Sequence, residues 1–308
     1  MKILLTFNPV AGKGLGAASA RAIRDHIHGH QLQDGRVVEV ESLETRLGCV
    51  TDWLSPNLEG VDLLVAIGGD GAVGMVAPAA VEAAIPIYHY PTGTENLFSR
   101  DHGMLADPVH LLDTIERGQR LKADVVEVEG ELMLMCASIG FDAEVVHDLA
   151  THRSGPISHL SYLGPILRSL FRWKRVRSHV SVSVDGGEFA NLGHGLLVLA
   201  NSSQYAMRLD PARAASPTSG VLEVVFLPVT ARFHLLIWAL RCRFGTHLSH
   251  PKAVFTRGRT ICVRCQPGAL VQIDGDAFKL GTLHETVQAR ILGRSLHVLA
   301  PSSEKPSN

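Results

Sequence analysis

The sequence predicts an α/β protein of two domains: a parallel α/β domain over residues 1–120 and a β-sandwich-like domain over residues 121–300. With 308 residues, the chain is long enough for two domains of about 100–200 residues each. Its first third alternates apolar runs with helical stretches, whereas the rest consists mainly of short alternating runs. The polar segment 301–308 predicts a disordered tail.

The composition argues against nucleic-acid binding and against a membrane-spanning protein. Lys plus Arg (29) nearly balance Asp plus Glu (30), and a net charge of −1 creates no general field for nucleic acid or an anionic membrane. No apolar run approaches the roughly 18 residues of a membrane span. The most apolar segment, Phe233–Leu240, is followed by Arg241 and Arg243, and we predict a buried helix there. A cytoplasmic protein without a nucleic-acid partner is expected.

In the first domain, strand and helix signals follow one another. Val61–Ile67 is a continuous apolar run, which is typical of a strand covered on both faces. Repeats of strand, loop and helix predict a parallel sheet with ligands at the carboxyl ends of its strands. The predicted strands are Lys2–Phe7, Arg36–Glu41, Val61–Ile67 and Ile85–Tyr90, and the predicted helices are Ala17–His28 and Ala72–Ala84.

The second domain shows short runs with period-two alternation, which favour an antiparallel sandwich. Only two convincing helices interrupt them, at about Ser158–Arg172 and Thr230–Phe244. The predicted strands are Ala123–Val128, Leu132–Ser138, His179–Val184, Gly195–Ala200, Leu222–Leu227, Thr260–Cys265 and Leu270–Ile273.

The loop Gly68-Gly69-Asp70-Gly71 follows a buried strand and opens a helix. Glycines let backbone N–H groups approach a phosphate, and the helix N-terminus adds a favourable dipole. Asp70 would act there through a metal ion or a polarised hydroxyl. Alone, the same four residues are equally typical of a tight turn with a helix-capping Asp.

Two further loops end predicted strands. Residues 8–14 read NPVAGKG, and residues 91–96 read PTGTEN. Each is weak evidence by itself, because such loops are usually ordinary turns. Three loops that end parallel strands of one sheet, however, predict a common phosphate-binding site at that edge.

The ordered set of motifs resembles the diacylglycerol kinase catalytic-domain family, which includes sphingosine kinases, ceramide kinases and bacterial lipid kinases. The likeness spans roughly residues 1–300, and the ordered set is far more specific than any one motif. The motifs are NPVAGKG (8–14), GGDGA (68–72), PTGTENLFSR (91–100), SIGFDAEVV (138–146) and IDGD (273–276).

This resemblance implies a Rossmann-like first domain, as in NAD kinase and diacylglycerol kinase, and ATP with Mg²⁺ in the cleft between the domains. Asp70 would meet the metal through Mg-ATP. The implied nucleotide-binding residues are Asn8, Pro9, Gly12, Gly68, Gly69, Asp70, Gly71, Thr92, Gly93, Thr94 and Asn96.

The resemblance also implies the catalytic carboxylates. Asp274 corresponds to the base that takes the proton from the lipid hydroxyl, Asp276 stands where the family carries Glu, and Asp70 completes the set. Phosphoryl transfer needs charge neutralisation and a proton acceptor beside the attacking oxygen. On the residues alone, Asp274-Gly275-Asp276 is also typical of a hairpin turn.

Several positions depart from the family pattern. Ala72 replaces a Thr, Glu95 brings negative charge near a polyanionic ligand, and Leu97 replaces an Asp. Thr218-Ser219-Gly220 replaces an acidic pair that accompanies a structural metal in the family, which leaves the presence of that metal open.

A basic–aromatic stretch contains Arg168, Arg172, Trp173, Lys174 and Arg175. Such a stretch could rest on an anionic bilayer and bring the protein to a lipid. A solvated helix end with inward-packed aromatic rings explains it equally well.

The favoured hypothesis is an ATP- and Mg²⁺-dependent kinase of a hydroxyl on a diacylglycerol- or sphingoid-like lipid. Alternatives are a catalytically impaired family member that binds nucleotide or lipid, and an NAD kinase. A homodimer is left open.

Overall fold

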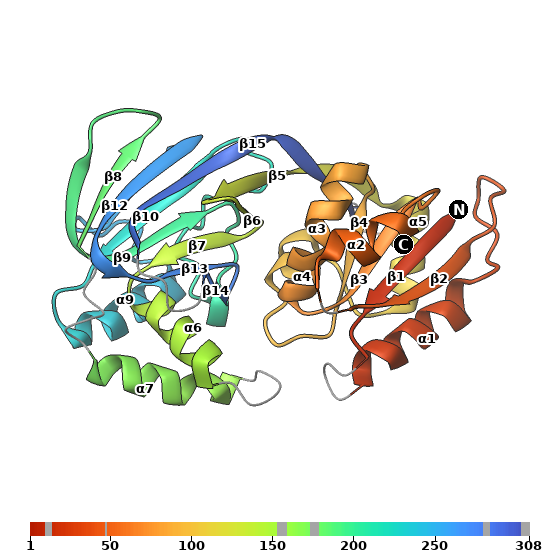
Figure 1. Ribbon diagram of the computed structural model, residues 1–308, viewed down its shortest axis with the longest axis horizontal. Helices are drawn as coiled ribbons and strands as arrows, with labels where there is room; N and C mark the ends of the chain where they lie inside the picture. Colours follow the sequence, from red (N-terminus) through yellow and green to blue (C-terminus); the bar gives the residue numbers. More distant parts are fainter. Residues whose placement is uncertain (10–13, 47, 153–158, 173–178, 280–283, 303–308) are drawn as a thin grey trace. The chain divides into compact units, whose positions relative to one another are not determined.

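The computed structural model describes residues 1–9, 14–46, 48–152, 159–172, 179–279 and 284–302 (Figure 1). Its contacts divide the chain into two compact units. Unit 1 comprises Met1–Ala123 with Arg294–Asn308, and unit 2 comprises Asp124–Gly293. The chain passes between the units within two long strands, β5 (Gln119–Val128) and β15 (His284–Ala300). Of residues 301–308, only Pro301 and Ser302 are described.

Unit 1 contains the parallel sheet that the sequence predicts, in the order β15-β4-β3-β1-β2. The central strands are buried because helices cover them, as their continuous apolar runs indicated. The second strand begins three residues later than predicted, at Glu39 rather than Arg36. The strands are β1 (Lys2–Phe7), β2 (Glu39–Glu44), β3 (Leu63–Gly68) and β4 (Ile87–Pro91).

The helices of unit 1 follow the strands. The alanine-rich helix α3 begins at Asp70, directly after the glycines that end β3, and it buries Val73, Val76 and Ala77. Its small side chains allow close packing on the sheet. The helices are α1 (Leu15–Ile27), α2 (Val50–Trp53), η2 (Ser55–Asn57), α3 (Asp70–Ala83), α4 (Leu97–His102) and α5 (Pro108–Arg117).

Unit 2 consists mainly of antiparallel strands, as predicted. Its core contains the inward-facing side chains of several strands, among them Leu197, Phe226 and Val263. A second cluster surrounds Trp238 and Cys242. The strands besides β5 and β15 are β6 (Glu131–Met133), β7 (Cys136–Ile139), β8 (His179–Val184), β9 (Ala190–Ala200), β10 (Leu222–Pro228), β11 (Val254–Gly258), β12 (Thr260–Ala269), β13 (Val271–Ile273) and β14 (Asp276–Ala277).

The sequence reading of two helices in this domain was incomplete, because a further helix, α6, spans Phe141–His152. Its inward face carries His147 and Asp148 beside the apolar residues, so the helical hydrophobic period is broken. The predicted helices are present as α7 (Leu163–Phe171) and α9 (Arg232–Phe244), and the short helices are η3 (His159–Tyr162) and η4 (Ala206–Arg208).

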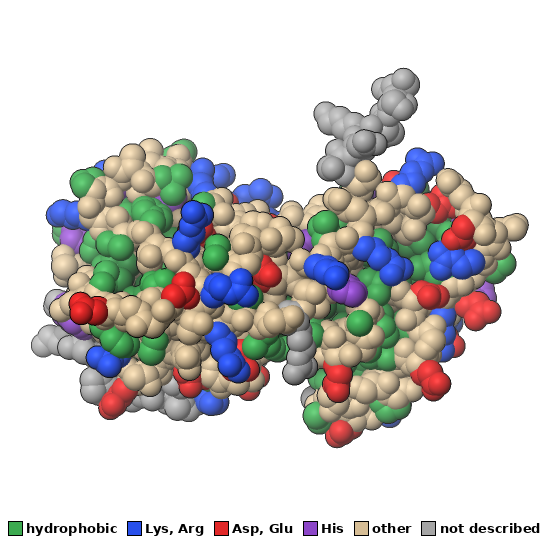
Figure 2. Space-filling model, turned by 90° about the horizontal axis from the view of Figure 1, so that it is seen from above, with side chains coloured by type: hydrophobic (Ala, Val, Ile, Leu, Met, Phe, Trp, Pro, Cys, Tyr) green, Lys and Arg blue, Asp and Glu red, His purple; other side chains and the backbone are tan. Residues whose placement is uncertain are grey.

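The prediction that Phe233–Leu240 is a buried helix was half wrong. The segment is helical, but within α9 only Trp238 and Cys242 are buried. Phe233 and Leu236 are 62% and 65% exposed. Within the described residues, no helix has the length and apolar content to cross a bilayer. Acidic and basic side chains are interspersed on the face that Figure 2 shows, in keeping with the balanced net charge.

Candidate functional site

The register of the parallel sheet brings three predicted loops to one edge of unit 1. Phe7 pairs with Ile67, and Gly68 pairs with Pro91. Asn8, Gly68 and Pro91 therefore stand at the carboxyl ends of three adjacent strands, where parallel sheets bind ligands.

The second and third loops contact each other through their glycine backbones. A Cβ atom at Gly93 would lie 2.5 Å from the Cα atom of Gly69, closer than any real side chain approaches. The Thr92 N–H also donates a hydrogen bond to the Gly68 carbonyl, with an N–O distance of 2.8 Å. Gly93 therefore has to be glycine at this contact, whereas a Cβ atom at Gly69 would make only a tight contact of 3.3 Å with the Gly93 Cα.

Side chains lock this arrangement. The Oδ1 atom of Asn96 accepts from the Gly93 N–H, and its Nδ2 donates to the Gly93 carbonyl, both at 2.9 Å. Asn96 itself has a φ of 51°, a left-handed conformation that Asn tolerates. The Oδ1 atom of Asp70 accepts from the Phe98 N–H at 2.9 Å, which joins the start of α3 to the first turn of α4.

The N-terminus of α3 lies at this edge, and its N-cap residue, Gly69, has no side chain that could cap it. Uncapped helix N-termini present N–H groups that favour anions. A Cβ atom at Gly68 would meet the Ala72 methyl at 2.5 Å, so Gly68 and Ala72 pack directly on each other.

Glu95 forms an ion pair with Arg100 at 3.4 Å, and the two side chains are 16% and 19% exposed. The negative charge that Glu95 brings to the loop is therefore balanced within the same loop and helix.

Two buried histidines behind the loops were missed by the sequence reading. His89 lies in the middle of β4, and its Nε2 donates to the Gly68 carbonyl at 2.9 Å. His102 donates from Nδ1 to the Phe98 carbonyl at 3.0 Å. Burial lowers the pKa of both rings. The available signal was a histidine inside an otherwise apolar strand, which indicates a specific buried contact.

Asp274 and Asp276 lie in unit 2, in the tight hairpin between β13 and β14. Asp274 and Gly275 have φ values of 50° and 89°, as a two-residue hairpin turn requires. The Asp274 carboxylate accepts three backbone N–H groups at 2.7–2.9 Å, from Leu134, Met135 and Cys136. Its orientation is therefore fixed by the backbone of residues 134–136, which lead into β7.

A polar cluster that the sequence reading did not identify lies nearby in unit 2. Ser138 and Tyr205 both donate to the Oδ2 atom of Asp142, and Gln272 donates to Ser138 Oγ at 2.7 Å. Burial raises the pKa of Asp142 and that of Tyr205. The family-like segment 138–146 pointed to this region, but Tyr205 and Gln272 are distant in sequence and only the fold assembles them.

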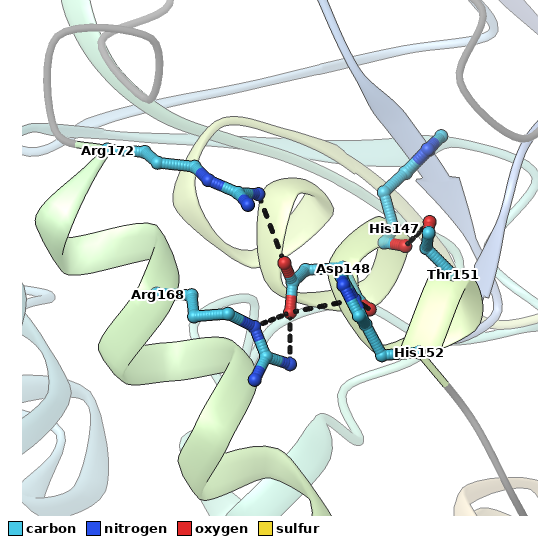
Figure 3. Close-up of polar contacts among 6 residues, drawn as sticks. All are labelled: His147, Asp148, Thr151, His152, Arg168 and Arg172. Atoms are coloured by element: carbon cyan, nitrogen blue, oxygen red, sulfur yellow. Dashed lines mark hydrogen bonds and ion pairs between the residues drawn. The ribbon is translucent and has the colours of Figure 1, made fainter.

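Arg168 and Arg172, two of the basic residues predicted to contact a membrane, form ion pairs with a buried carboxylate (Figure 3). Asp148, only 3% exposed, pairs with Arg168 at 2.5 Å and with Arg172 at 3.1 Å. These contacts join α6 to α7. Trp173, Lys174 and Arg175 lie outside the described residues. His147, on the same helix as Asp148, is buried and contacts the Val271 carbonyl.

The segment Thr218-Ser219-Gly220 is held by hydrogen bonds to Asp124 and Ser216. The Gly220 N–H donates to Asp124 Oδ2 at 2.7 Å, and Ser219 Oγ donates to the Ser216 carbonyl at 2.9 Å. Among the described residues, no group of three or more His, Cys, Asp or Glu side chains gathers as a metal site.

The predicted nucleotide-binding residues thus fall into three groups. Gly68, Gly69, Asp70, Thr92, Gly93 and Asn96 are brought together by direct contacts. Asn8, Pro9 and Thr94 follow the same strand ends and Gly71 lies in the first turn of α3, with Asn8, Gly71 and Thr94 exposed. Gly12 lies outside the described residues.

Comparison with known proteins agrees with this architecture. Residues 2–128 match the diacylglycerol kinase catalytic domain, and residues 135–300 match the YegS C-terminal NAD kinase beta sandwich-like domain. A diacylglycerol kinase of Mycobacterium tuberculosis is 25% identical over 282 residues, which cover 89% of this chain and 88% of that protein.

Solved structures show the same fold. The crystal structure of a diacylglycerol kinase from Bacillus anthracis str. Sterne has a TM-score of 0.67 at 16% identity and covers 97% of this chain and 96% of its own. Yeast NADH kinase complexed with NADH has a TM-score of 0.52 at 9% identity, covering 98% and 84%.

The chain is therefore a distant member of the diacylglycerol kinase family, a family of lipid kinases, with a parallel α/β N-terminal domain and a β-sandwich-like C-terminal domain. Membership implies ATP as the phosphate donor.

Proposed function

We propose that the protein transfers the γ-phosphate of ATP to a hydroxyl group of a diacylglycerol- or sphingoid-like lipid. The observation that carries this proposal is the contact between Gly69 and Gly93, which joins two glycine loops beside the N-terminus of α3, where the N-cap residue Gly69 has no side chain. The N-terminus of α3 offers backbone N–H groups to phosphate oxygens, and the glycine contact beside it excludes side chains that would keep a phosphate away.

Asp70 is the proposed partner of Mg²⁺. Its carboxylate has the hard oxygen donors that Mg²⁺ prefers, and this metal is usually held by one or two carboxylates together with substrate phosphates. The hydrogen bond from Phe98 fixes the Asp70 side chain at the start of α3. Bound Mg²⁺ would neutralise charge on the transferred phosphate.

Asp274 is the proposed proton acceptor, with Asp276 as the neighbouring carboxylate. The three N–H groups that bind Asp274 also support a structural role, because they orient the hairpin against residues 134–136. A test of catalysis at Asp274 therefore needs a separate measurement of folding.

The sharpest test uses Asp70→Asn. Asn keeps the Oδ1 acceptor for the Phe98 N–H and removes only the charge, so the fold should be retained. We expect wild-type protein to transfer labelled γ-phosphate from Mg-ATP into mixed-lipid vesicles and Asp70→Asn to lose about a hundredfold or more of that rate. Thermal unfolding by circular dichroism serves as the folding control, and NAD replaces lipid in a parallel assay.

A catalytically impaired, nucleotide-binding member is the second candidate. The observation that favours it is Ala72, whose methyl packs on Gly68 where related motifs supply a hydroxyl. ATP binding without transfer to any lipid would support this candidate and contradict the kinase proposal. A gain of transfer in Ala72→Thr would then identify the missing hydroxyl as the cause.

A further inference from the structure

Helix α9 has an exposed apolar stripe. At about 100° per residue, positions i, i+3, i+4, i+7 and i+11 share one face of a helix. On α9 these positions carry only large apolar side chains, between 41% and 74% exposed. The residues of this α9 stripe are Phe233, Leu236, Ile237, Leu240 and Phe244.

The opposite face of α9 is firmly anchored, so the exposure of the stripe does not come from a loosely held helix. The Trp238 Nε1 donates to the Pro228 carbonyl at 2.7 Å. At the C-terminus, the Arg213 guanidinium donates to the carbonyls of Cys242 and Arg243, at 2.7 and 3.0 Å. His247, which is fully buried, contacts the Pro211 carbonyl at 2.8 Å.

Basic residues flank the α9 stripe on both sides. By helical geometry, Arg232 and Arg243 fall about 100° and 80° to one side of Phe233, and Arg241 falls about 80° to the other. An apolar face bordered by arginines is the pattern of a helix that lies in the plane of a membrane surface, with its charges at the headgroups.

The sequence around α9 carries basic residues but no acidic ones. Between Glu223 and Asp274 it contains no acidic residue. A second copy of the chain would therefore bring like charges together across this face with no carboxylate on α9 to pair them, whereas anionic lipid headgroups complement them. The basic residues of this interval are Arg232, Arg241, Arg243, Lys252, Arg257, Arg259 and Arg264.

We propose that the α9 stripe is a membrane-docking surface that inserts into the headgroup region of bilayers containing anionic lipid. The helix has 13 residues, or about 20 Å, which suits insertion parallel to the surface and not a span. This docking is independent of phosphoryl transfer and requires neither ATP nor an acceptor lipid.

The test is sedimentation of the full chain with vesicles of phosphatidylglycerol and phosphatidylcholine, without nucleotide or diacylglycerol. Wild type should bind, and Leu240→Glu and Phe244→Glu should each lower the partition coefficient about tenfold or more. The matched control is Val109→Glu on α5, which is 58% exposed and lies outside unit 2, and it should bind as wild type does.

Arg243→Gln should weaken binding to these vesicles and reduce its salt dependence, because the arginine acts through headgroup charge. Equal binding of wild type and both glutamate variants would overturn the proposal. So would a wild-type dimer, seen by analytical ultracentrifugation, that the glutamate variants dissociate, since a second copy would then cover the stripe. Because no kinase reaction is involved, either result leaves the proposed function to its own test.

Discussion

Gly69 and Gly93 meet backbone to backbone, so that a Cβ atom at Gly93 would lie 2.5 Å from the Gly69 Cα and 2.8 Å from the Asn96 Oδ1. Neither neighbour can yield easily, because the first is main chain and the second is held by two hydrogen bonds. This contact makes one surface of two loops that are separated by more than a whole helix in the sequence.

Gly93→Ala should therefore push the two loops apart. We expect about 1–3 kcal/mol of lost stability and at least about a tenfold weaker affinity for Mg-ATP. Chemical denaturation and calorimetric titration measure the two effects. Gly74→Ala is the control, because a Cβ there meets nothing within 4 Å and Ala favours the interior of α3, so it should stabilise by up to about 1 kcal/mol. If the affinity of Gly93→Ala for Mg-ATP is unchanged, the contact between Gly69 and Gly93 is not part of the nucleotide site.

The ion pair between Glu95 and Arg100 leads to a prediction about ATP affinity. Arg100→Ala leaves Glu95 without its 3.4 Å ion-pair partner next to the phosphate loops, so ATP affinity should fall several-fold. The double variant Glu95→Ala/Arg100→Ala removes both charges and should recover most of that loss. A double-mutant cycle on the dissociation constant checks this. If the double variant binds as poorly as Arg100→Ala, Arg100 acts through another contact.

The variant Asp274→Asn tests how much Asp274 contributes to the stability of the fold. Asn tolerates the left-handed backbone at this turn, but its amide nitrogen would replace an oxygen that now accepts an N–H from residues 134–136. The cost of such an unsatisfied donor is about 1–3 kcal/mol. Urea denaturation should show this loss in Asp274→Asn and little change in the exposed Asp276→Asn. Full stability with abolished phosphate transfer would instead assign Asp274 a purely chemical role.

Acid should destabilise the protein through His89 and His102. Unfolded histidine binds its proton near 6.5, whereas burial lowers the folded-state pKa of both rings. Between these values the unfolded chain binds more protons, so the free energy of unfolding falls as the pH drops below about 6.5. Denaturation measured from about pH 7.5 to about pH 5.5 gives the free energy of unfolding as a function of pH. The slope of that dependence should be smaller in His89→Gln than in the exposed-site variant His26→Gln. Identical slopes would contradict this origin.

Much of the fold follows from local pattern. Continuous apolar runs predicted β1 and β3, and alternating runs predicted the antiparallel strands of unit 2, because buried and half-buried strands differ in period. Helix α6 was missed because His147 and Asp148 interrupt its apolar face, and their partners, the Val271 carbonyl and Arg168, come from elsewhere in the chain.

The sequence predicted where the glycines of the candidate site lie, but not which partners its charged side chains have. Gly69 follows β3 directly and Gly93 comes two residues after β4, so sequence order and parallel pairing bring them together. That Arg100 neutralises Glu95, or that Asp274 faces the backbone of residues 134–136, depends on side-chain direction, which one sequence does not specify.

By itself, the sequence determined the family, the order of the elements and the loops that meet at the edge of the first sheet, because these depend on residue type and spacing along the chain. Only the tertiary structure decided which apolar residues face solvent and which charges are paired. The α9 stripe illustrates this: its apolar content predicted burial, but burial depends on whether another element covers that face, and within the described fold α9 packs through Trp238 and Cys242 instead.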